Sequence, residues 1–433
     1  MNFRFRLGLA MLTGAATGLL YAEGVLKTGW IEAALSIPIC LLLIATGPLA
    51  RVLPNLLICI TAISLLVTTL DLILRPTFED RLHYSPMNIS PHALPELPIV
   101  ARWDPHQNYD SEGYGDLAAM AGDLSLQERR KIVFRTDEFG FRNRPGARPT
   151  DVLILGDSFP AGAGTTDEEI FPRLLEDTYG FRVYNLSFPG GGPYDQLINF
   201  AIEWPKWNVT PPQMIWTFYT GNDMDDEGGN TWDLENLPWQ HGLSAWRERF
   251  KSYRRRSPIN QLMGAVRMKF KDKPTHVIVR SLPDGKPVLF LRSQEIAAKR
   301  SRHEVEQHPN FPKLQRTLAL MRRLTAERHV EVKVLILPTK GEVYRWLLEE
   351  RPPQPEDSRA SGFSLAVVEA CRTVGIVCHD MKPYLVSEAK RLYDTEGKLL
   401  WWRDDTHIGR YGHAAIAAYI VENVLSKMRG DIQ

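Results

Sequence analysis

The stretch Asp151-Val-Leu-Ile-Leu-Gly-Asp-Ser-Phe-Pro160 decides the fold of this chain. A short aliphatic run stops at Gly156-Asp157-Ser158, and the small residues at 161–164 precede a helical pattern. An apolar run of this length that ends in a turn is typical of a buried strand in a parallel sheet. The sequence therefore predicts a strand that brings the hydroxyl of Ser158 to the edge of an α/β sheet.

Other short apolar runs repeat this pattern along the chain, and helical patterns lie between them. The alternation predicts an α/β fold, with a doubly wound parallel sheet and right-handed crossovers. Polar candidates follow several of these runs, at the sheet edge where such folds bind their ligands. The runs are 182–185, 214–219, 332–337 and 376–378, and clear helical patterns cover 170–178 and 312–329.

A base for the serine is found near the C-terminus, in Trp401-Trp-Arg-Asp-Asp-Thr-His-Ile-Gly-Arg-Tyr-Gly-His413. A serine hydroxyl is a weak nucleophile unless an imidazole accepts its proton. A neighbouring carboxylate fixes the tautomer of that imidazole and stabilises its charged form. Asp404 and His407 precede a helix predicted over 414–425, so we expect both side chains to face the cleft of Ser158. His413 is expected to be a packed or surface residue of that helix.

Two further residues are candidates for binding a developing oxyanion. Gly190 closes the stretch Asn185-Leu-Ser-Phe-Pro-Gly190, and a glycine lets its backbone N–H approach a substrate closely. Asn222 lies in Gly221-Asn222-Asp223, and its amide offers a neutral donor. Each motif alone is an ordinary turn, and the adjacent aspartates are good helix caps. Their combination indicates a catalytic site.

These four blocks resemble, in the same order, the motifs of the SGNH (GDSL) hydrolase superfamily, whose members are serine esterases, deacetylases and acyl-transfer enzymes. Gly156-Asp157-Ser158 resembles its nucleophile block, and Gly190 falls in its glycine block. Gly221-Asn222-Asp223 matches its G-x-N-D block, and Asp404-Asp405-Thr406-His407 matches its D-x-x-H block. The resemblance covers the chain from about residue 151 to the C-terminus.

The resemblance implies a flavodoxin-like sheet and a role for each matched residue. Ser158 is the implied nucleophile, His407 the base, and Asp404 the acid that orients the base. The implied oxyanion hole combines the N–H groups of Ser158 and Gly190 with the side chain of Asn222. Some branches use the aspartate closer to the histidine, here Asp405, but D-x-x-H is the commoner spacing and favours Asp404. No cofactor is implied, and no Cys/His cluster has the spacing of a metal site.

The first 75 residues contain three apolar segments, at 7–22, 31–50 and 53–74. The second and third are long enough to cross roughly 30 Å of hydrocarbon as helices. The first is shorter and follows Arg4 and Arg6, so it is either a retained membrane helix, which we favour, or a signal-peptide core. With Arg4, Arg6 and Arg51 in the cytoplasm, both schemes place the chain after residue 75 outside it, on the periplasmic side of an inner membrane in a bacterium with two membranes.

Three other regions carry expectations. Residues 76–150 form a polar, proline-rich approach segment that we expect to pack on the catalytic domain. It carries Arg135-Thr-Asp-Glu-Phe-Gly-Phe-Arg-Asn143, and similar T-D-x-x-G-F-R stretches precede the nucleophile strand in some membrane-bound members of the superfamily. An insertion at about 228–312 contains a hairpin predicted over 277–292 and a basic, aromatic stretch at 247–273. We interpret that stretch as a solvated helix face, with contact to anionic head groups or an acidic polymer as the alternative. Lys340–Tyr344 is interpreted as a solvated helix start, with the cleft wall as the alternative.

Composition adds few constraints. A formal net charge of +1 gives no general case for nucleic acid, and 44% hydrophobic residues suit a globular domain with a membrane anchor. Cys40 and Cys59 lie in the apolar segments as packing residues. Cys371 and Cys378 flank a helix-to-strand connection and could form a disulfide in an oxidising compartment.

Two functions follow from the sequence. The first is a membrane-anchored extracytoplasmic serine esterase or acyltransferase, acting on an O-acyl group of an envelope glycan or a lipid-linked sugar. The second is a membrane-anchored accessory subunit that keeps the fold and works with membrane-protein partners. The full set of motif residues favours the enzyme.

Overall fold

The computed structural model describes residues 101–147, 151–206, 211–227, 234–237 and 276–425, with some single positions between 62 and 100 and residue 239. The chain divides into two compact units. One comprises Met1–His83 with Gln240–Asp272, and the other comprises Tyr84–Trp239 with Lys273–Gln433. The second unit contains the sheet and every residue of the site described below.

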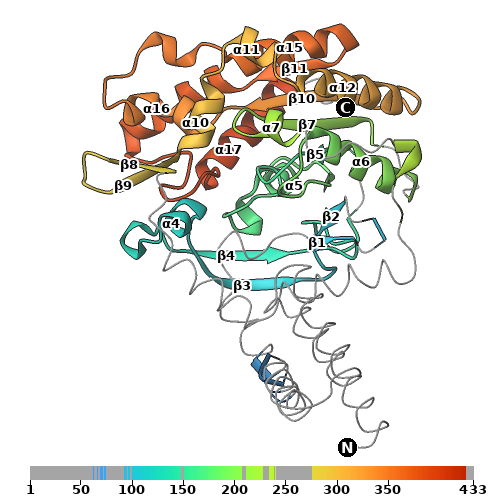
Figure 1. Cartoon of the computed structure of the whole chain (residues 1–433), viewed down its shortest axis with the longest axis horizontal. Helices are drawn as coiled ribbons and strands as arrows, with labels where there is room; N and C mark the ends of the chain where they lie inside the picture. The colour runs from blue at the N-terminus through green and yellow to red at the C-terminus, as the bar shows by residue number, and fades with distance from the viewer. Residues whose placement is uncertain are drawn as a thin grey trace, which may run out of the picture. The chain divides into compact units, whose positions relative to one another are not determined.

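A five-stranded parallel sheet forms the centre of this unit, in the order β11-β10-β7-β5-β6 (Figure 1). Numbered along the chain this is the order 2-1-3-4-5, in which the direction of winding reverses between β5 and β7. The mixed α/β fold with a parallel sheet is therefore confirmed. The strands are β5 (Val152–Leu155), β6 (Val183–Asn185), β7 (Gln213–Tyr219), β10 (Glu331–Leu337) and β11 (Val377–Asp380).

Helices cover both faces of the sheet. Val152 and Ile154 of β5 belong to the core on one face, and Leu153 and Leu155 belong to the core on the other. Strands buried on both sides have continuous apolar sequences, which explains why they could be found without an alternating pattern. The first core includes residues of α5 (Phe171–Asp177), α16 (Lys382–Glu396) and α17 (Arg410–Tyr419); the second includes residues of α6 (Pro193–Glu203), α12 (Phe311–Ala326) and α15 (Gly362–Val374).

The observed elements lie close to the expected ones. The C-terminal helix starts at Arg410 rather than at 414 and continues as a π-helical segment, Ile420–Val424. The predicted hairpin is present as β8 (Val277–Ser281) and β9 (Pro287–Leu291), with Gly285 at φ +80° in its turn. The shorter elements are β1 (His92–Ala93), β2 (Ala101–Arg102), α7 (Asp223–Asp226), α10 (Arg292–Ala298), α11 (Arg302–Glu306), α13 (Lys340–Val343) and α14 (Arg345–Leu348).

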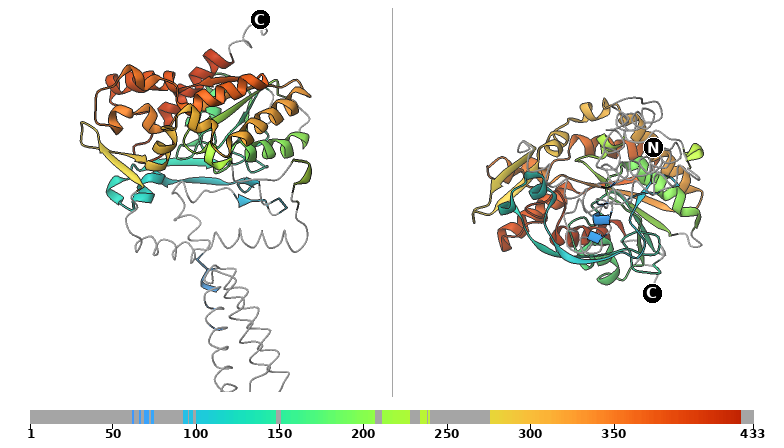
Figure 2. Two further views of the ribbon diagram at one scale, coloured as in Figure 1. Left: turned by 45° about the horizontal axis from the view of Figure 1, so that its top comes forward. Right: turned by 60° about the horizontal axis from the view of Figure 1, so that its bottom comes forward.

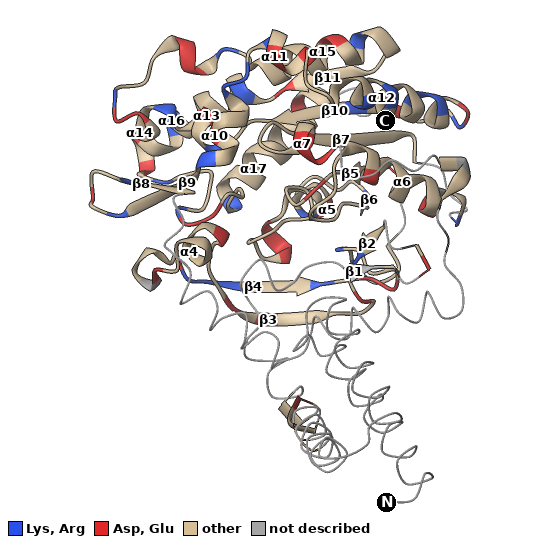
Figure 3. Ribbon diagram, in the orientation of Figure 1, with Lys and Arg blue, Asp and Glu red and all other residues tan. Residues whose placement is uncertain are grey.

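The approach segment forms an antiparallel ribbon of its own. Strand β3 (Asn108–Gly113) pairs with β4 (Arg130–Arg135), and α4 (Asp116–Ala121) lies in the connection between them. Figures 1 and 2 show this ribbon in teal, on the opposite side of the unit from the orange helices α12 and α15. Charges of both signs are interspersed over the described helices and loops (Figure 3).

The described residues contain no helix that is both long enough and apolar enough to cross a bilayer. The expected membrane segments 7–22 and 31–50 lie outside the described residues, and segment 53–74 is described only at single positions. The basic stretch 247–273 also lies outside them.

A disulfide joins Cys371 at the end of α15 to Cys378 in β11, with their Cα atoms 6.2 Å apart. It closes the tight connection between a covering helix and the edge strand of the sheet. The bond links the two cysteines for which the sequence left this pairing open.

Candidate active site

Ser158 lies just after β5, beside the point where the winding of the sheet reverses. Its Oγ is 2.8 Å from Nε2 of His407. The residue after the strand, Gly156, packs closely against β7. An added Cβ there would lie 1.9 Å from Oγ1 of Thr217, so this position requires a glycine. The buried carboxylate of Asp157 accepts a hydrogen bond from the N–H of Phe159 and so fixes the turn around the serine. The hydroxyl is thus directed to the imidazole, as the sequence led us to expect.

The acid that contacts the imidazole is Asp405. Its Oδ1 is 2.7 Å from Nδ1 of His407 and also accepts the backbone N–H of His407 at 3.1 Å. The sequence predicted this contact for Asp404, and the structure has Asp405 in its place. Asp405 lies two residues before the histidine in a turn, and its side chain is on the same side of the loop as the imidazole. The side chain of Asp404 instead points to the approach segment. The continuous chain of contacts is therefore Ser158, His407, Asp405.

Asp404 anchors the loop instead. Its fully buried carboxylate accepts the backbone N–H groups of Gly115 and Glu128, each at 2.7 Å. It also accepts Nη1 of Arg130 at 2.9 Å. Gly115 must be a glycine for this close approach, because an added Cβ would lie 1.9 Å from the carbonyl oxygen of Asp404. Asp404 therefore ties the loop that carries the histidine to the approach segment.

Arg130 connects the two aspartates. Its second terminal nitrogen, Nη2, donates to Oδ2 of Asp405 at 2.7 Å, and its guanidinium stacks over Trp402 at 4.3 Å. The arginine belongs to β4, so the approach segment holds the aspartate that contacts the imidazole. Sequence reasoning missed Arg130, because no local pattern relates it to aspartates more than 270 positions away.

A third acid, Asp116 of α4, was also missed. Its Oδ1 accepts the N–H of Thr406 at 2.8 Å, and its Oδ2 accepts the hydroxyl of Thr406 at 2.5 Å. The same Oδ2 is 3.8 Å from Nδ1 of His407. Asp116 thus lies against the same side of the imidazole as Asp405.

Burial and charge shift the protonation of these groups. Burial alone would lower the pKa of His407, but the adjacent Asp405 and then Asp116 raise it to about 9. Burial alone would raise the pKa of Asp405, but the charges of His407 and Arg130 hold it well below its usual range. Burial, followed by the charge of Asp405, raises the pKa of Asp116 to about 7. The imidazole is therefore a strengthened base whose acid partner stays ionised.

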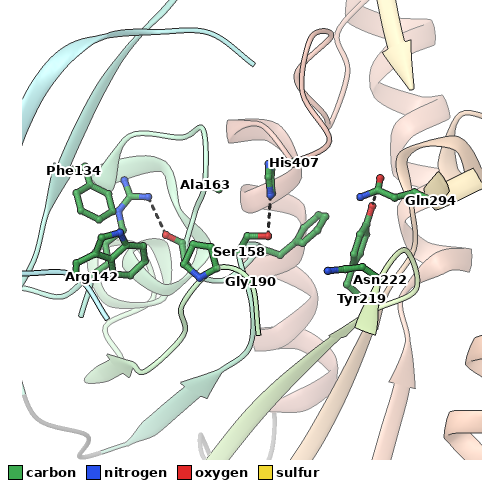
Figure 4. A pocket seen from close by; sticks show the side chains of 13 residues that line it. Phe134, Arg142, Ser158, Ala163, Gly190, Tyr219, Asn222, Gln294 and His407 are labelled. Carbon is green, nitrogen blue, oxygen red and sulfur yellow. Dashed lines mark hydrogen bonds between the residues drawn. The ribbon is translucent and has the colours of Figure 1, made fainter. Parts of the chain in front are cut away.

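The expected oxyanion groups line the same pocket as Ser158 and His407. Gly190 adopts φ +82°, and an added Cβ there would meet nothing within 4 Å, so its backbone is open to a ligand. Asn222 donates one amide hydrogen to Oδ2 of Asp226 at 2.5 Å. Because an amide nitrogen carries two hydrogens, this bond holds the group and leaves one hydrogen to donate. In Figure 4 the amide nitrogen points to the Ser158 side of the pocket.

The pocket is a cavity of about 250 Å³ with two chemically different walls. Aromatic and small residues from the approach segment and the nucleophile loop, together with Arg142, form one wall, and the polar side chains of Tyr219, Asn222 and Gln294 form the other (Figure 4). On the polar wall the hydroxyl of Tyr219 donates to Oε1 of Gln294 at 3.0 Å (Figure 4). The residues that line the pocket are Trp103, Phe134, Arg142, Ser158, Phe159, Ala161, Ala163, Pro189, Gly190, Tyr219, Asn222, Gln294 and His407.

The motif 136–143 forms hydrogen bonds with the loop that carries the nucleophile. Arg142 is buried and donates to Asp167 at 2.7 Å and to the backbone carbonyls of Ala161 and Thr165. Asn143 donates to the carbonyl of Asn185 at 3.1 Å and accepts the N–H of that residue at 2.7 Å. The motif therefore supports the loops after β5 and β6 from one side.

Lys340 differs from both expectations for its segment. The segment is a helix start, with a capping box between Thr339 and Glu342, but Lys340 is only 2% exposed and does not line the pocket. Its ammonium donates to the carbonyls of Trp402, Arg403 and Asp405 at 2.6, 2.9 and 3.1 Å. Burial lowers its pKa to about 8. The lysine therefore holds the backbone of the loop that carries His407.

His413 is fully buried on α17, where its Nδ1 accepts the N–H of Phe171 at 3.2 Å. Burial lowers its pKa well below the usual value. It is a packed helix residue, one of the two places expected for it, and it does not line the pocket.

One group within the described residues has the geometry to hold a metal ion: Asp116, Asp405 and His407, whose ligand atoms lie within 4.8 Å of one another. The same atoms already have partners. His407 uses both ring nitrogens, Asp405 accepts from Arg130, and Asp116 accepts two hydrogen bonds from Thr406. The arrangement suits proton transfer from a serine to an imidazole.

No protein-family model and no curated protein matches this chain. Among solved structures, the chain is similar to a psychrotrophic esterase, EstA from Pseudoalteromonas sp., in a crystal structure inhibited by monoethylphosphonate. The two are 13% identical with a TM-score of 0.32, over 65% of this chain and 99% of the esterase.

Proposed function

We propose that this protein is a serine hydrolase or acyltransferase of the SGNH type that acts on acyl esters. The observation that carries the proposal is the chain of contacts from Ser158 Oγ through His407 to Asp405, at 2.8 and 2.7 Å, at the wall of an open pocket. Nucleophile, base and orienting acid in this geometry are the elements of acyl transfer by serine. The matching sequence blocks support the same assignment.

In the proposed reaction Ser158 attacks the carbonyl carbon of the ester as Nε2 of His407 takes the hydroxyl proton. The N–H groups of Ser158 and Gly190 and the amide of Asn222 stabilise the negative charge on the carbonyl oxygen. The imidazolium then gives its proton to the leaving alcohol, and an acyl-serine results. Water, or the hydroxyl of an acceptor, is deprotonated by His407 and takes the acyl group.

Asp405 has the role that the sequence assigned to Asp404. Its carboxylate fixes the tautomer in which Nδ1 carries hydrogen and Nε2 accepts the serine proton, and it stabilises the imidazolium. Arg130 and Lys340 hold the loop that carries both residues. Because Arg130 comes from β4, the approach segment is part of the proposed catalytic unit.

The substrate we propose is an O-acyl group on an envelope glycan or a lipid-linked sugar. The cavity of about 250 Å³ suits a small acyl group, and its polar wall of Asn222, Tyr219 and Gln294 offers hydrogen bonds to hydroxyl groups. We further propose that the catalytic unit lies outside the cytoplasm behind an N-terminal membrane anchor. The apolar segments and Arg4, Arg6 and Arg51 support this topology. The disulfide supports an oxidising compartment.

The test is labelling of the full-length protein with a fluorophosphonate, which forms a stable adduct with an activated serine. We expect labelling that is lost in Ser158→Ala and kept in Ser358→Ala, a helix serine outside the pocket. Peptide mapping should place the adduct on Ser158. A folded wild-type protein that does not react would overturn the proposal of an enzyme and favour the alternative function as an accessory subunit. Turnover of an acylated sugar, with and without an acceptor, then separates hydrolysis from transfer.

A further inference from the structure

His407 is flanked by more acid than a catalytic triad requires. Asp405 contacts Nδ1 at 2.7 Å, and Oδ2 of Asp116 lies 3.8 Å from the same nitrogen. Asp405 belongs to the loop of the histidine itself, but Asp116 is the first residue of α4 in the approach segment. A separate part of the chain thus brings a second carboxyl group to the imidazole.

The position of Asp116 is fixed by Thr406, the residue between Asp405 and His407. One carboxyl oxygen accepts the backbone N–H of Thr406, and the other accepts its hydroxyl. Asp116 is 7% exposed, so water screens its charge only weakly. Two hydrogen bonds on one residue hold both the carboxyl group and the backbone next to the histidine.

The other charged groups around this cluster come from several elements. Arg130 of β4 binds Asp404 and Asp405, and Glu128 precedes it. Lys340 of α13 donates to the backbone of the loop, and the charge of Asp157, the residue before the nucleophile, also acts on His407. Arg130 and Lys340 are directed to Asp404, Asp405 and the loop carbonyls. The Asp116 carboxyl accepts from the neutral Thr406, and its other close neighbour is the Asp405 carboxyl, which raises the pKa of Asp116 by its charge and by a shared hydrogen bond.

We propose that Asp116 is a positioning residue of the same site: it fixes the Thr406–His407 segment through both carboxyl oxygens and adds a second carboxyl to the Nδ1 side of the imidazole. The inference rests on the proposed function, because its effect is exerted on the base that activates Ser158. The charge that Asp116 adds makes Nε2 a stronger acceptor for the serine proton. No bond to substrate is involved, and Asp405 stays the partner of Nδ1–H.

The protonation state of Asp116 makes its effect on the pKa of His407 depend on pH. Its pKa, raised by burial and by Asp405 to about 7, makes this carboxyl ionise near neutral pH. Once ionised, it adds to the charge of Asp405 and helps to raise the pKa of His407. The base is therefore strengthened over the pH range in which the second acid loses its proton.

The experiment measures the rate of fluorophosphonate reaction at Ser158 as a function of pH, between about pH 5 and about pH 10, in the full-length protein. The rate follows the deprotonated fraction of His407, so its midpoint reports the base directly and no natural substrate is needed. In Asp116→Asn we expect the midpoint to move to lower pH by at least about half a unit, because a nearby negative charge is lost. Asp116→Glu keeps the charge and should keep a high midpoint with a lower maximal rate.

Two further variants separate charge from position. Thr406→Val removes one of the two hydrogen bonds to Asp116 but keeps its charge, so we expect a lower maximal rate without the downward shift. Asp357→Asn removes a buried carboxylate that pairs with Arg351 away from the pocket and should change neither value. An unchanged midpoint in folded Asp116→Asn, or equal midpoints in the Asn and Glu variants, would overturn the inference. A wild-type protein that does not react at any pH would instead overturn the proposed function.

Discussion

Asp404 and Asp405 are adjacent, but their carboxylates face different partners. Asp405 faces the imidazole and Arg130, whereas Asp404 is enclosed by Gly115, Glu128 and Arg130. The spacing D-x-x-H therefore identified the loop that carries the histidine and its acid, but it pointed to Asp404 where Asp405 makes the contact. Which of two neighbouring aspartates meets a histidine depends on the dihedral angles of one turn, and residues far away in sequence fix those angles.

The two aspartates should respond differently to neutral substitution. Asp405→Asn leaves the imidazole in the wrong tautomer and is expected to lower kcat by about 10⁴-fold in the protein that folds. It also breaks a buried pair with Arg130, so some loss of stability accompanies the loss of activity. Asp404→Asn breaks a buried pair with Arg130 and should destabilise the fold by about 3–5 kcal/mol. Turnover of an activated ester and thermal unfolding measure the two effects. The reverse ranking in kcat would restore Asp404 as the triad acid.

The pH dependence of activity should be displaced to alkaline values. A base with a pKa raised to about 9 is mostly protonated at neutral pH, so kcat/KM should rise about tenfold per pH unit up to that range. Stability should change in the opposite direction. A histidine pKa raised above its ordinary 6.5 stabilises the fold fully below that pH, and this contribution is lost as pH rises through about 9. Activity that levels off below pH 7 would contradict the assignment.

Asn222 tests the oxyanion site. If its amide binds the developing oxyanion, Asn222→Ala should lower kcat by about 10²–10³-fold with a much smaller effect on KM. Asn222→Asp keeps the shape but replaces the donor with an acceptor, and it should be at least as impaired. A variant with normal kcat and a lower melting temperature would show that Gly221-Asn222-Asp223 is only a turn.

At the level of elements, the sequence predicted the sheet well because its strands are short, continuous apolar runs. β5 was expected over 152–155 and spans Val152–Leu155. The start of α17 was expected four residues late, since Arg410-Tyr-Gly-His413 has no apolar periodicity.

The parts of the site that sequence reasoning missed are contacts between elements. Asp116, Arg130 and Lys340 lie on three different elements and meet at one loop. None of them has a motif that relates it to that loop, and each has an ordinary alternative as a surface charge. Only burial and direct hydrogen bonds distinguish them from the other charged residues of the chain.

The disulfide between α15 and β11 should stabilise the fold without affecting the chemistry. It closes a loop with a sequence separation of 7, at the edge strand of the sheet, and neither cysteine lines the pocket. Replacing both cysteines with serine should cost about 2–3 kcal/mol of unfolding free energy and leave fluorophosphonate labelling unchanged. Thermal unfolding with and without a reductant is the measurement. Loss of labelling in the folded double variant would link this edge to the site.

At the level of the whole molecule, the topology is the main proposal. Alkaline phosphatase fused after Gln433 requires an oxidising compartment for activity, and we expect it to be active. A fluorescent reporter that folds only in the cytoplasm should stay dark at the same position. Replacing Arg4 and Arg6 with glutamine should weaken this difference, because cytoplasmic positive charges set orientation. A bright reporter with inactive phosphatase would contradict both the topology and an envelope substrate.

The contacts of Asp404 and Asp405 with the approach segment have a practical consequence for anyone who expresses part of this protein. A fragment that starts at residue 151 would contain the whole parallel sheet and all the motif residues. It would lack Gly115, Asp116, Glu128 and Arg130, so the loop of His407 would lose its partners and two aspartates would lose their counter-ion. Such a fragment would keep the parallel sheet but would lack the contacts that hold His407, and its inactivity would say nothing about the proposed activity of the intact protein.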